Sequence, residues 1–256
     1  MSAFAPAPGA APLARMVSAQ ALLETRLLLR NGEQLVLAVV VPLLVLVGVA
    51  EAGARVDLGP GPRIDVLTPG VLALAVLSTA FTSVAIATGF ERRYGVLKRL
   101  GASPLPRSGL LLGKVGAVLL VEAVQLALIS AVAAALGWQP TGGLVGLLGT
   151  ALLVLLGTAA FGSLALLMAG VLRAEATLAA ANLVFLLLLV GGGVIVPLDL
   201  YPEAARGLLA LLPSAALAEG LRDASSGRGL ATGSAVVLVG WTVLAAALAA
   251  RTFRWE

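Results

Sequence analysis

Few side chains in this sequence could carry out chemistry, and one of them lies in an unusual place. Glu122 is the only ionisable residue far from both ends of a long apolar segment, and Gln125 follows it by about one helical turn. An acid at that depth in a membrane costs about 2.5 to 3.5 kcal/mol, so Glu122 should face protein or water and not lipid. Two roles stay open. A protonated Glu122 could hydrogen-bond a neighbouring helix and share its bonds with Gln125, or Glu122 could handle substrate or protons.

Other polar side chains within apolar segments are uncharged. Ser78, Thr79, Thr82 and Ser83 recur at helical spacing and predict a hydroxyl stripe on one face, and Asn182 lies in another apolar segment. Hydroxyl groups of this kind commonly join helices to one another inside membranes. We keep both interpretations, helix packing and the lining of a translocation path.

The residues needed for membrane enzymes are missing. The chain has no cysteine and no histidine, which removes thiolate catalysis, cysteine metal sites and the commonest general base. One lone acid provides neither a catalytic pair nor a carboxylate cluster for a metal, so no metal site is predicted. A secondary transporter would need ligands for a coupling ion and usually an internal repeat, and we find neither.

One string resembles half of a phosphate-binding loop. GLLLGKV, Gly109–Val115, has three residues between glycine and Gly-Lys where such a loop needs four, and Val115 stands where Ser or Thr would hold magnesium. We therefore predict no nucleotide site. Any ATP-driven function would need a second polypeptide.

Composition places the chain in the membrane. It has 256 residues, of which 60% are hydrophobic and 12% charged, and a mean hydropathy of +1.05, too apolar for the surface of a soluble domain. The formal net charge is +4, but the basic residues flank the apolar segments and do not form an aromatic-rich face, so nucleic acid is not an expected partner.

The apolar segments predict an all-α integral membrane protein with six transmembrane helices. A proline- and alanine-rich stretch, residues 1–12, is expected to be a disordered tail, and 13–256 a single transmembrane domain. Leu13–Glu33 predicts an amphipathic helix on the membrane surface, with its arginines on one face. Glu203–Leu212 and Ser214–Ala224 are too short to span and predict re-entrant helices between the last two spans. The predicted spans are 35–50, 66–89, 115–136, 144–172, 176–197 and 234–250.

The basic residues predict the orientation. Phe90–Lys114 contains six of the seventeen Lys and Arg residues and a single acid, which marks a cytoplasmic loop under the positive-inside rule. With that loop inside, twelve basic residues lie on the cytoplasmic side and five on the outer side. Both termini are then cytoplasmic.

Within that loop, Phe90, Tyr94, Leu97 and Leu100 recur at helical spacing, which predicts a short amphipathic helix that ends before Pro104. The order of residue types resembles the cytoplasmic coupling helix of ABC-2 type transporter permeases, which docks into a separate ATP-binding subunit. The resemblance implies that the following residues contact the ATPase: Glu91, Arg92, Arg93, Tyr94, Gly95, Leu97, Lys98, Leu100 and Pro104.

A second segment supports the resemblance. GGVIVPLDLYPEAARGLLALLPSAALAEGLRDA is similar to the segment between the fifth and sixth helices of the same permeases, and its matching positions include Pro197, Pro202, Pro213 and Arg222. The resemblance also implies that Leu13–Glu33 is the family's connecting helix, which touches the ATPase.

The resemblance implies an exporter subunit of the bacterial cytoplasmic membrane. It implies a second permease chain, most simply a homodimer, and two copies of an ABC ATPase that bind ATP and magnesium. The Leu-, Val- and Ala-rich spans favour a hydrophobic or amphipathic small molecule, such as a drug, antibiotic or lipid, as substrate. A lipid-linked polysaccharide or envelope precursor is the alternative substrate, and a membrane binding or immunity protein without transport is the alternative class.

Overall fold

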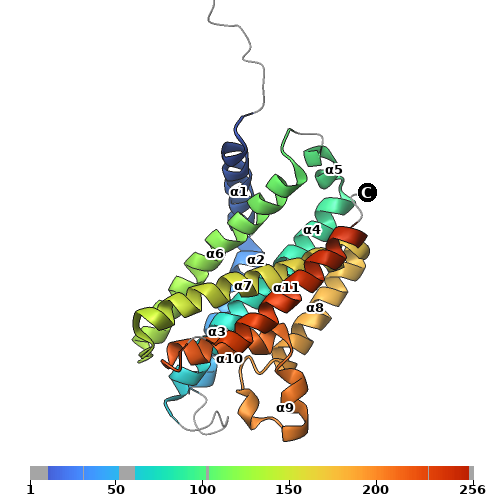
Figure 1. Ribbon diagram of the computed structural model, residues 1–256. Coiled ribbons are helices and arrows are strands. Elements are labelled where there is room, and N and C mark those ends of the chain that lie inside the picture. The colour runs from blue at the N-terminus through green and yellow to red at the C-terminus, as the bar shows by residue number, and fades with distance from the viewer. Residues whose placement is uncertain (1–10, 31, 52–60, 102–103, 230, 254–256) are drawn as a thin grey trace, which may run out of the picture.

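The computed structural model describes residues 11–30, 32–51, 61–101, 104–229 and 231–253, so the predicted tail, 1–12, lies almost wholly outside it. Within these ranges the chain forms helices and no strand (Figure 1). We call the end of the bundle that holds α5 the α5 end and the opposite end the α9 end. The elements are α1 (Leu13–Arg30), α2 (Gly32–Glu51), α3 (Arg63–Val76), η2 (Leu77–Ser83), α4 (Val84–Arg93), α5 (Val96–Gly101), α6 (Arg107–Ala135), α7 (Gly143–Val171), α8 (Ala174–Gly191), η3 (Leu198–Leu200), α9 (Glu203–Leu209), α10 (Pro213–Ser225) and α11 (Thr232–Thr252).

Long apolar helices run between the two ends. In the described part of the chain, five are long and apolar enough to cross a membrane: Arg63–Arg93, Ser108–Ala135, Gly143–Val171, Ala174–Gly191 and Thr232–Thr252. Helix α2 lies beside them, and its 20 residues would reach about 30 Å at roughly 1.5 Å per residue. The prediction of an all-α integral membrane protein is confirmed.

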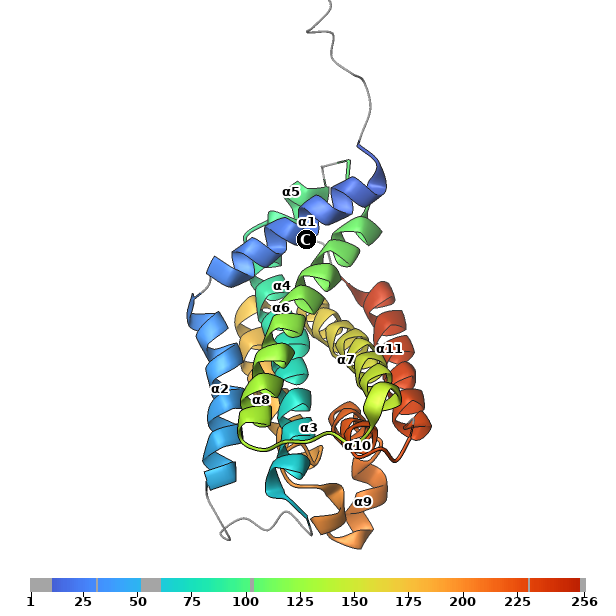
Figure 2. The ribbon, with the colours of Figure 1, turned by 90° about the vertical axis from the view of Figure 1, so that its left-hand side faces the viewer.

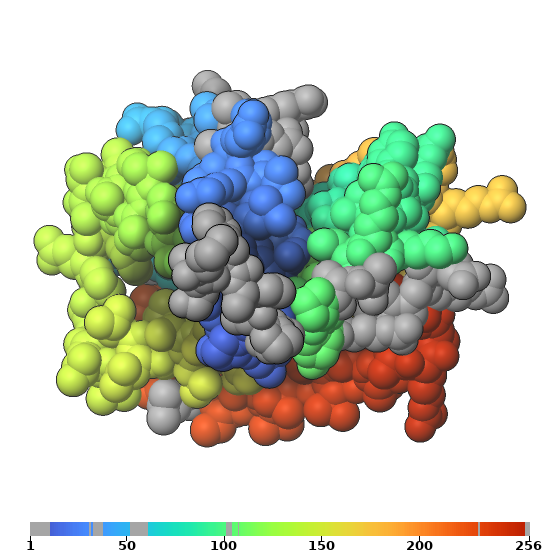
Figure 3. Space-filling model, turned by 90° about the horizontal axis from the view of Figure 1, so that it is seen from above, coloured from blue at the N-terminus to red at the C-terminus, as the bar shows by residue number. Residues whose placement is uncertain are grey.

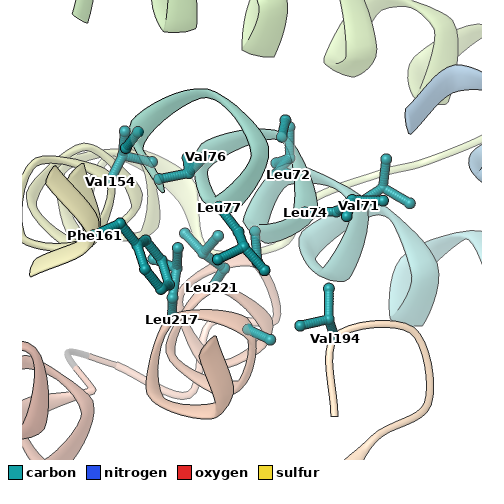
Figure 4. Packing of buried hydrophobic residues seen from close by; sticks show 14 of the residues in the cluster. Val71, Leu72, Leu74, Val76, Leu77, Val154, Phe161, Val194, Leu217 and Leu221 are labelled. Carbon is teal, nitrogen blue, oxygen red and sulfur yellow. The ribbon is translucent and has the colours of Figure 1, made fainter. Parts of the chain in front are cut away.

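The centre of the bundle is the second predicted span. Helix α3, the π-helical segment η2 and α4 form one continuous helix, and nearly every side chain from Leu67 to Leu77 is buried. Figure 4 shows Leu77 of this helix packed against Phe161 of α7 and Leu217 of α10. A helix covered on all sides is apolar all round, which explains why Thr68 is the single polar side chain between Leu67 and Leu77.

Helix α1 lies across α6 at the α5 end (Figure 2). The approach is close because α6 presents glycines there: a Cβ at Gly113 would lie 2.6 Å from Cγ of Gln20, and one at Gly116 would lie 3.4 Å from Cβ of Ala21. The predicted surface helix, Leu13–Glu33, is present but ends at Arg30.

The predicted single helix Phe90–Leu100 is wrong. Helix α4 continues to Arg93, the chain turns at Tyr94 and Gly95, and α5 begins at Val96. Gly95 has a φ of 68°, a left-handed conformation that glycine adopts without steric cost, and it separates α4 from α5.

Two other helix boundaries differ clearly from those of the predicted spans, each by more than one helical turn. Helix α6 begins at Arg107 instead of residue 115, because a proline just before a helix, here Pro106, does not interrupt it. Helix α8 ends at Gly191 instead of residue 197, before Gly192 and Gly193, and Gly193 has a φ of 59°.

The two predicted short helices are present as α9 and α10, which meet at an angle of 97° at the α9 end. Three of the predicted prolines stand where helices start. Pro197 and Pro202 directly precede η3 and α9, and Pro213 is the first residue of α10, positions where the missing N–H costs nothing.

Candidate functional site

The turn between α4 and α5 forms an exposed basic surface at the α5 end. Tyr94, Lys98 and Arg99 are exposed, whereas Leu97 on the opposite side of α5 is buried. Figure 3 views the molecule from the α5 end and shows the α4–α5 region and α1 next to one another at the surface. Of the predicted contact residues, Pro104 is also exposed, and Gly95 and Leu100 are half-buried.

Behind this surface, Arg92 joins the turn to the end of α7. Its Nη1 donates to the carbonyl oxygen of Gly170 at 2.5 Å, and its Nη2 donates to the carbonyl oxygen of Leu172. These carbonyl groups lie at the C-terminus of α7, where backbone acceptors lack helical partners and the helix dipole favours a positive charge. Arg92 is therefore directed into the bundle and not toward a docking partner.

Arg93 joins the same turn to the start of α8 through an ion pair with Glu175. Both side chains are about half exposed, so the pair adds at most about 1 kcal/mol to stability. The Arg93 guanidinium also lies 5.8 Å from the centre of the Tyr94 ring, within the range of a cation–π contact. The ion pair thus links the start of α8 to the turn.

Lys114 connects the turn to α1 and α6. Its Nζ donates to Glu91 Oε1 and Oε2 at 2.8 and 3.0 Å, and it lies 3.4 Å from Glu24 Oε2. Gln20 of α1 donates to Glu24 Oε1 at 3.0 Å. All three charged side chains are mostly buried, which strengthens their attraction relative to a surface pair. Through Lys114, Glu91 therefore joins the end of α4 to α6 and α1.

Six of the nine predicted contact residues fall into two groups. Tyr94, Lys98 and Pro104 face outward, whereas Glu91, Arg92 and Leu97 face the bundle. Sequence reasoning missed the exposed Arg99 and also the partners of the inner group. Glu24 is the single acid in α1, and an acid on the packed face of an otherwise basic helix is the signal that could have identified it.

A polar layer crosses the middle of the bundle. The Thr158 hydroxyl of α7 lies 2.6 Å from Glu122 Oε2, and Thr79 donates to Gln125 Oε1 at 2.9 Å. Gln125 also donates to the carbonyl oxygen of Ala38 in α2. The prediction that Glu122 shares hydrogen bonds with Gln125 is wrong, because the two side chains bond to different helices.

The hydrogen positions around Glu122 are constrained. The Thr158 hydroxyl also lies 2.9 Å from the carbonyl oxygen of Val154. A hydroxyl has one hydrogen and can donate to only one of these acceptors. Both contacts are hydrogen bonds when Oε2 carries a proton, and Glu122 is then neutral. Its other oxygen, Oε1, is buried and has no hydrogen-bond partner among the described residues.

Part of the predicted hydroxyl stripe shares one face, because Thr79 and Ser83 line the same small cavity, although η2 has π-helical geometry with more residues per turn than an α-helix. Lys114 lies at the same cavity, Thr79 also donates to Gln125 of α6, and Ser83 donates to the carbonyl oxygen of Ser78 at 3.3 Å. Asn182 lies apart from this group, exposed on α8.

At the α9 end, Arg222 joins three segments. It donates to the carbonyl oxygens of Gly193 and Val194 at 2.9 Å each and to that of Val66 at 3.3 Å. Its ion pair with Glu219 measures 2.7 Å, and Glu219 also accepts from the backbone N–H of Leu198 at 3.1 Å. The side chain is 5% exposed. Arg222 therefore fixes the α9–α10 hairpin against α3 and the end of α8.

No group of three Asp, Glu, His or Cys side chains that could hold a metal occurs within the described ranges.

The search of curated proteins finds no match. The sequence model of the family described as ABC-2 type transporter matches residues 20–225. That range runs from the packed face of α1, through the basic α4–α5 turn, to the last turn of α10. The chain therefore belongs to the ABC-2 type transporter family.

Proposed function

We propose that the chain is the permease subunit of an ATP-driven exporter that moves a hydrophobic or amphipathic small molecule from the cytoplasmic side outward. The carrying observation is the α4–α5 turn, which exposes basic side chains on one side and is joined to four helices on the other. Members of the family are membrane domains that normally pair with a separate ABC ATPase. The chain carries no complete nucleotide-binding motif, so ATP and magnesium belong to that partner.

The proposed orientation places the α5 end in the cytoplasm of a bacterial cell, in its inner membrane. The exposed bases include Lys98 and Arg99 of α5, Arg173 directly before α8 and Arg251 in the last turn of α11, and these helix ends lie at the α5 end (Figure 1). Anionic lipid headgroups and the positive-inside rule both favour this side for such a cluster. The uncommonly basic turn is then directed to the compartment that contains ATP.

The proposed mechanism is mechanical. When the ATPase moves the α4–α5 turn, Arg92 and Arg93 transmit the displacement to the adjacent ends of α7 and α8. Glu91 transmits it through Lys114 to α6 and, by way of Glu24, to α1. Each link is a polar contact between rigid helices, so a shift of the turn displaces whole helices and does not merely deform a loop.

A second permease copy completes the proposed transporter, with two ATPases beneath. Asn182 supports it, because this amide lies near the middle of α8 and is exposed in the single chain. An amide facing hydrocarbon without a hydrogen-bond partner is costly. A second copy packed on α8 would supply a hydrogen-bond partner, since hydrogen bonds from asparagine side chains commonly join membrane helices.

The coupling proposal is tested with purified permease and the ABC ATPase that co-purifies with the native permease. The variant Lys98→Glu/Arg99→Glu should lose most ATPase capture, because two charges of the exposed surface are reversed. Arg251→Glu, an exposed base of α11 at the same end, is the matched control and should capture normally. Equal capture by both variants would refute docking at this surface.

A third variant separates docking from transmission. Arg92 faces the bundle, so Arg92→Gln should leave ATPase capture within about twofold of the native level. It should nevertheless abolish most of the stimulation of ATP hydrolysis by the permease, because α7 no longer follows the turn. Loss of capture in this variant would place Arg92 in the docking surface and contradict the proposed path.

A further inference from the structure

A groove opens between α6 and α7 in the half of the bundle nearer the α5 end. Its volume is about 260 Å³, and its wall is apolar apart from Lys114 at one end and two hydroxyl groups. Figure 1 shows α6 and α7 diverging toward the α5 end. The floor is formed by Ala80 and Val84 of the central helix, and the depth comes from Ala159 and Gly162 of α7.

The inner end of the groove meets the Glu122–Thr158 contact. Thr158 lines the groove and also binds Glu122 Oε2. Val118 and Leu119, which line the groove, precede Glu122 by four and three residues on α6, so the three side chains share one helix face. The free oxygen of Glu122 is thus one helical turn from the groove, on a side chain that is 1% exposed.

We propose that this groove binds an amphipathic amine, whose alkyl chain fills the apolar part and whose nitrogen reaches Glu122. The buried Oε1 lacks a hydrogen-bond donor, and a buried acceptor left unpaired is costly. Binding of the amine requires the Glu122 carboxyl group to turn about its side-chain bonds toward Thr158 and the end of the groove. A neutral amine that arrives from the lipid takes the carboxyl proton, which leaves an ammonium–carboxylate pair with no proton gained or lost overall.

Charge favours an amine over an anionic lipid. Lys114, the base at the other end of the groove, already bonds to two carboxylates, and that group would repel a phosphate. Export of the bound amine rests on the proposed function of the chain. Amine binding itself requires neither ATP nor the ATPase.

The test measures binding to the purified permease in nanodiscs. The probe is dodecylamine with a dansyl group at the far end of its chain, displaced by unlabelled dodecylamine or by dodecyl methyl ether, and empty nanodiscs give the background. The ether has the same chain and no hydrogen-bond donor. Saturable binding displaced at least about tenfold better by the amine is expected from one hydrogen bond to a charged group.

Two glycines provide a matched pair of variants. A Cβ at Gly162 or at Gly240 meets nothing within 4 Å, so a side chain can begin at either position without overlapping protein atoms. Gly162 lines the groove, whereas Gly240 is exposed on α11. Gly162→Leu should weaken amine binding about tenfold or more, and Gly240→Leu should change it less than about twofold. Equal binding by these two variants would overturn the site.

Glu122→Gln tests the polar end. The glutamine keeps the size and the carbonyl acceptor but cannot give up a proton, so amine affinity should fall about tenfold while displacement by the ether stays unchanged. Equal displacement by amine and ether in the native chain would reduce the groove to an unspecific lipid-filled surface and refute the proposal. Normal ATPase capture alongside absent amine binding would refute this site alone and leave the proposed transporter standing.

Discussion

Replacement of Arg222 by leucine is expected to remove the contacts that hold the α9–α10 hairpin against α3 and to destabilise the whole bundle. The substitution removes three donors to backbone carbonyl groups from a side chain that is 5% exposed. It also leaves Glu219 without its cation. Leucine fills part of the volume but satisfies none of these acceptors.

The magnitude follows from two limits. Interhelical hydrogen bonds in membranes average about 0.6 kcal/mol, so three of them give a lower limit of about 2 kcal/mol. Removing one partner of a buried, hydrogen-bonded ion pair costs about 3 to 5 kcal/mol, which gives the upper limit. Arg222→Leu should therefore lower the free energy of unfolding by about 2 to 5 kcal/mol. Arg222→Lys should recover only part of the loss, because an ammonium group lacks the planar fork that reaches three segments at once.

The assay is unfolding by SDS titration in mixed micelles, followed by circular dichroism. Arg228→Leu is the matched control: Arg228 belongs to the same region and pairs with Asp223 at 2.8 Å, but its side chain is 63% exposed. Its loss should change stability by less than about 1 kcal/mol. The reasoning is refuted if the Arg222 and Arg228 variants unfold at the same SDS fraction, since burial would then contribute nothing.

Two further predictions concern single positions. In this cysteine-free chain, Asn182→Cys should crosslink two permease copies in membranes, whereas Ala181→Cys, which is buried in its own bundle, should not; crosslinking at both or neither would contradict the proposed interface. Gly70→Ala should cost about 1 to 3 kcal/mol in the SDS titration, because its Cβ would overlap the carbonyl oxygen of Val194. Gly48→Ala, whose Cβ meets nothing within 4 Å, should be neutral or slightly stabilising, and an equal loss at both glycines would show that contact with Val194 is not the cause.

Several parts of the fold could be predicted from the sequence because their causes are local. A long apolar segment forms a helix in a membrane whatever its neighbours are, since its backbone must satisfy its own hydrogen bonds. The predicted spans differ from the helices mainly at their ends, because this constraint applies inside the membrane and not where a helix extends beyond it. The two short helices at the α9 end were also predictable, because Pro202 and Pro213 mark their starts and their length forbids a crossing.

The candidate site was only partly predictable. The basic α4–α5 turn was identified from charge and from its resemblance to a family, both of which are visible along the chain. The break at Gly95 was missed because a glycine in a helical pattern is compatible with continuation as well as with termination. The helical spacing of apolar residues continues from Phe90 across the break to Leu100, so periodicity alone predicted one helix where there are two.

The amino-acid sequence by itself determined that this chain is an all-α membrane protein with a basic turn at one end and a bent hairpin at the other, since hydropathy, charge and proline act within a few residues. The tertiary structure alone decided what the polar side chains do. Arg92 bonds to carbonyl groups 78 and 80 residues away, Thr158 lies 36 residues from Glu122, and Arg222 reaches Val66 across 156 residues. Such pairs depend on how whole helices cross, and no pattern along one helix contains the position of its neighbour.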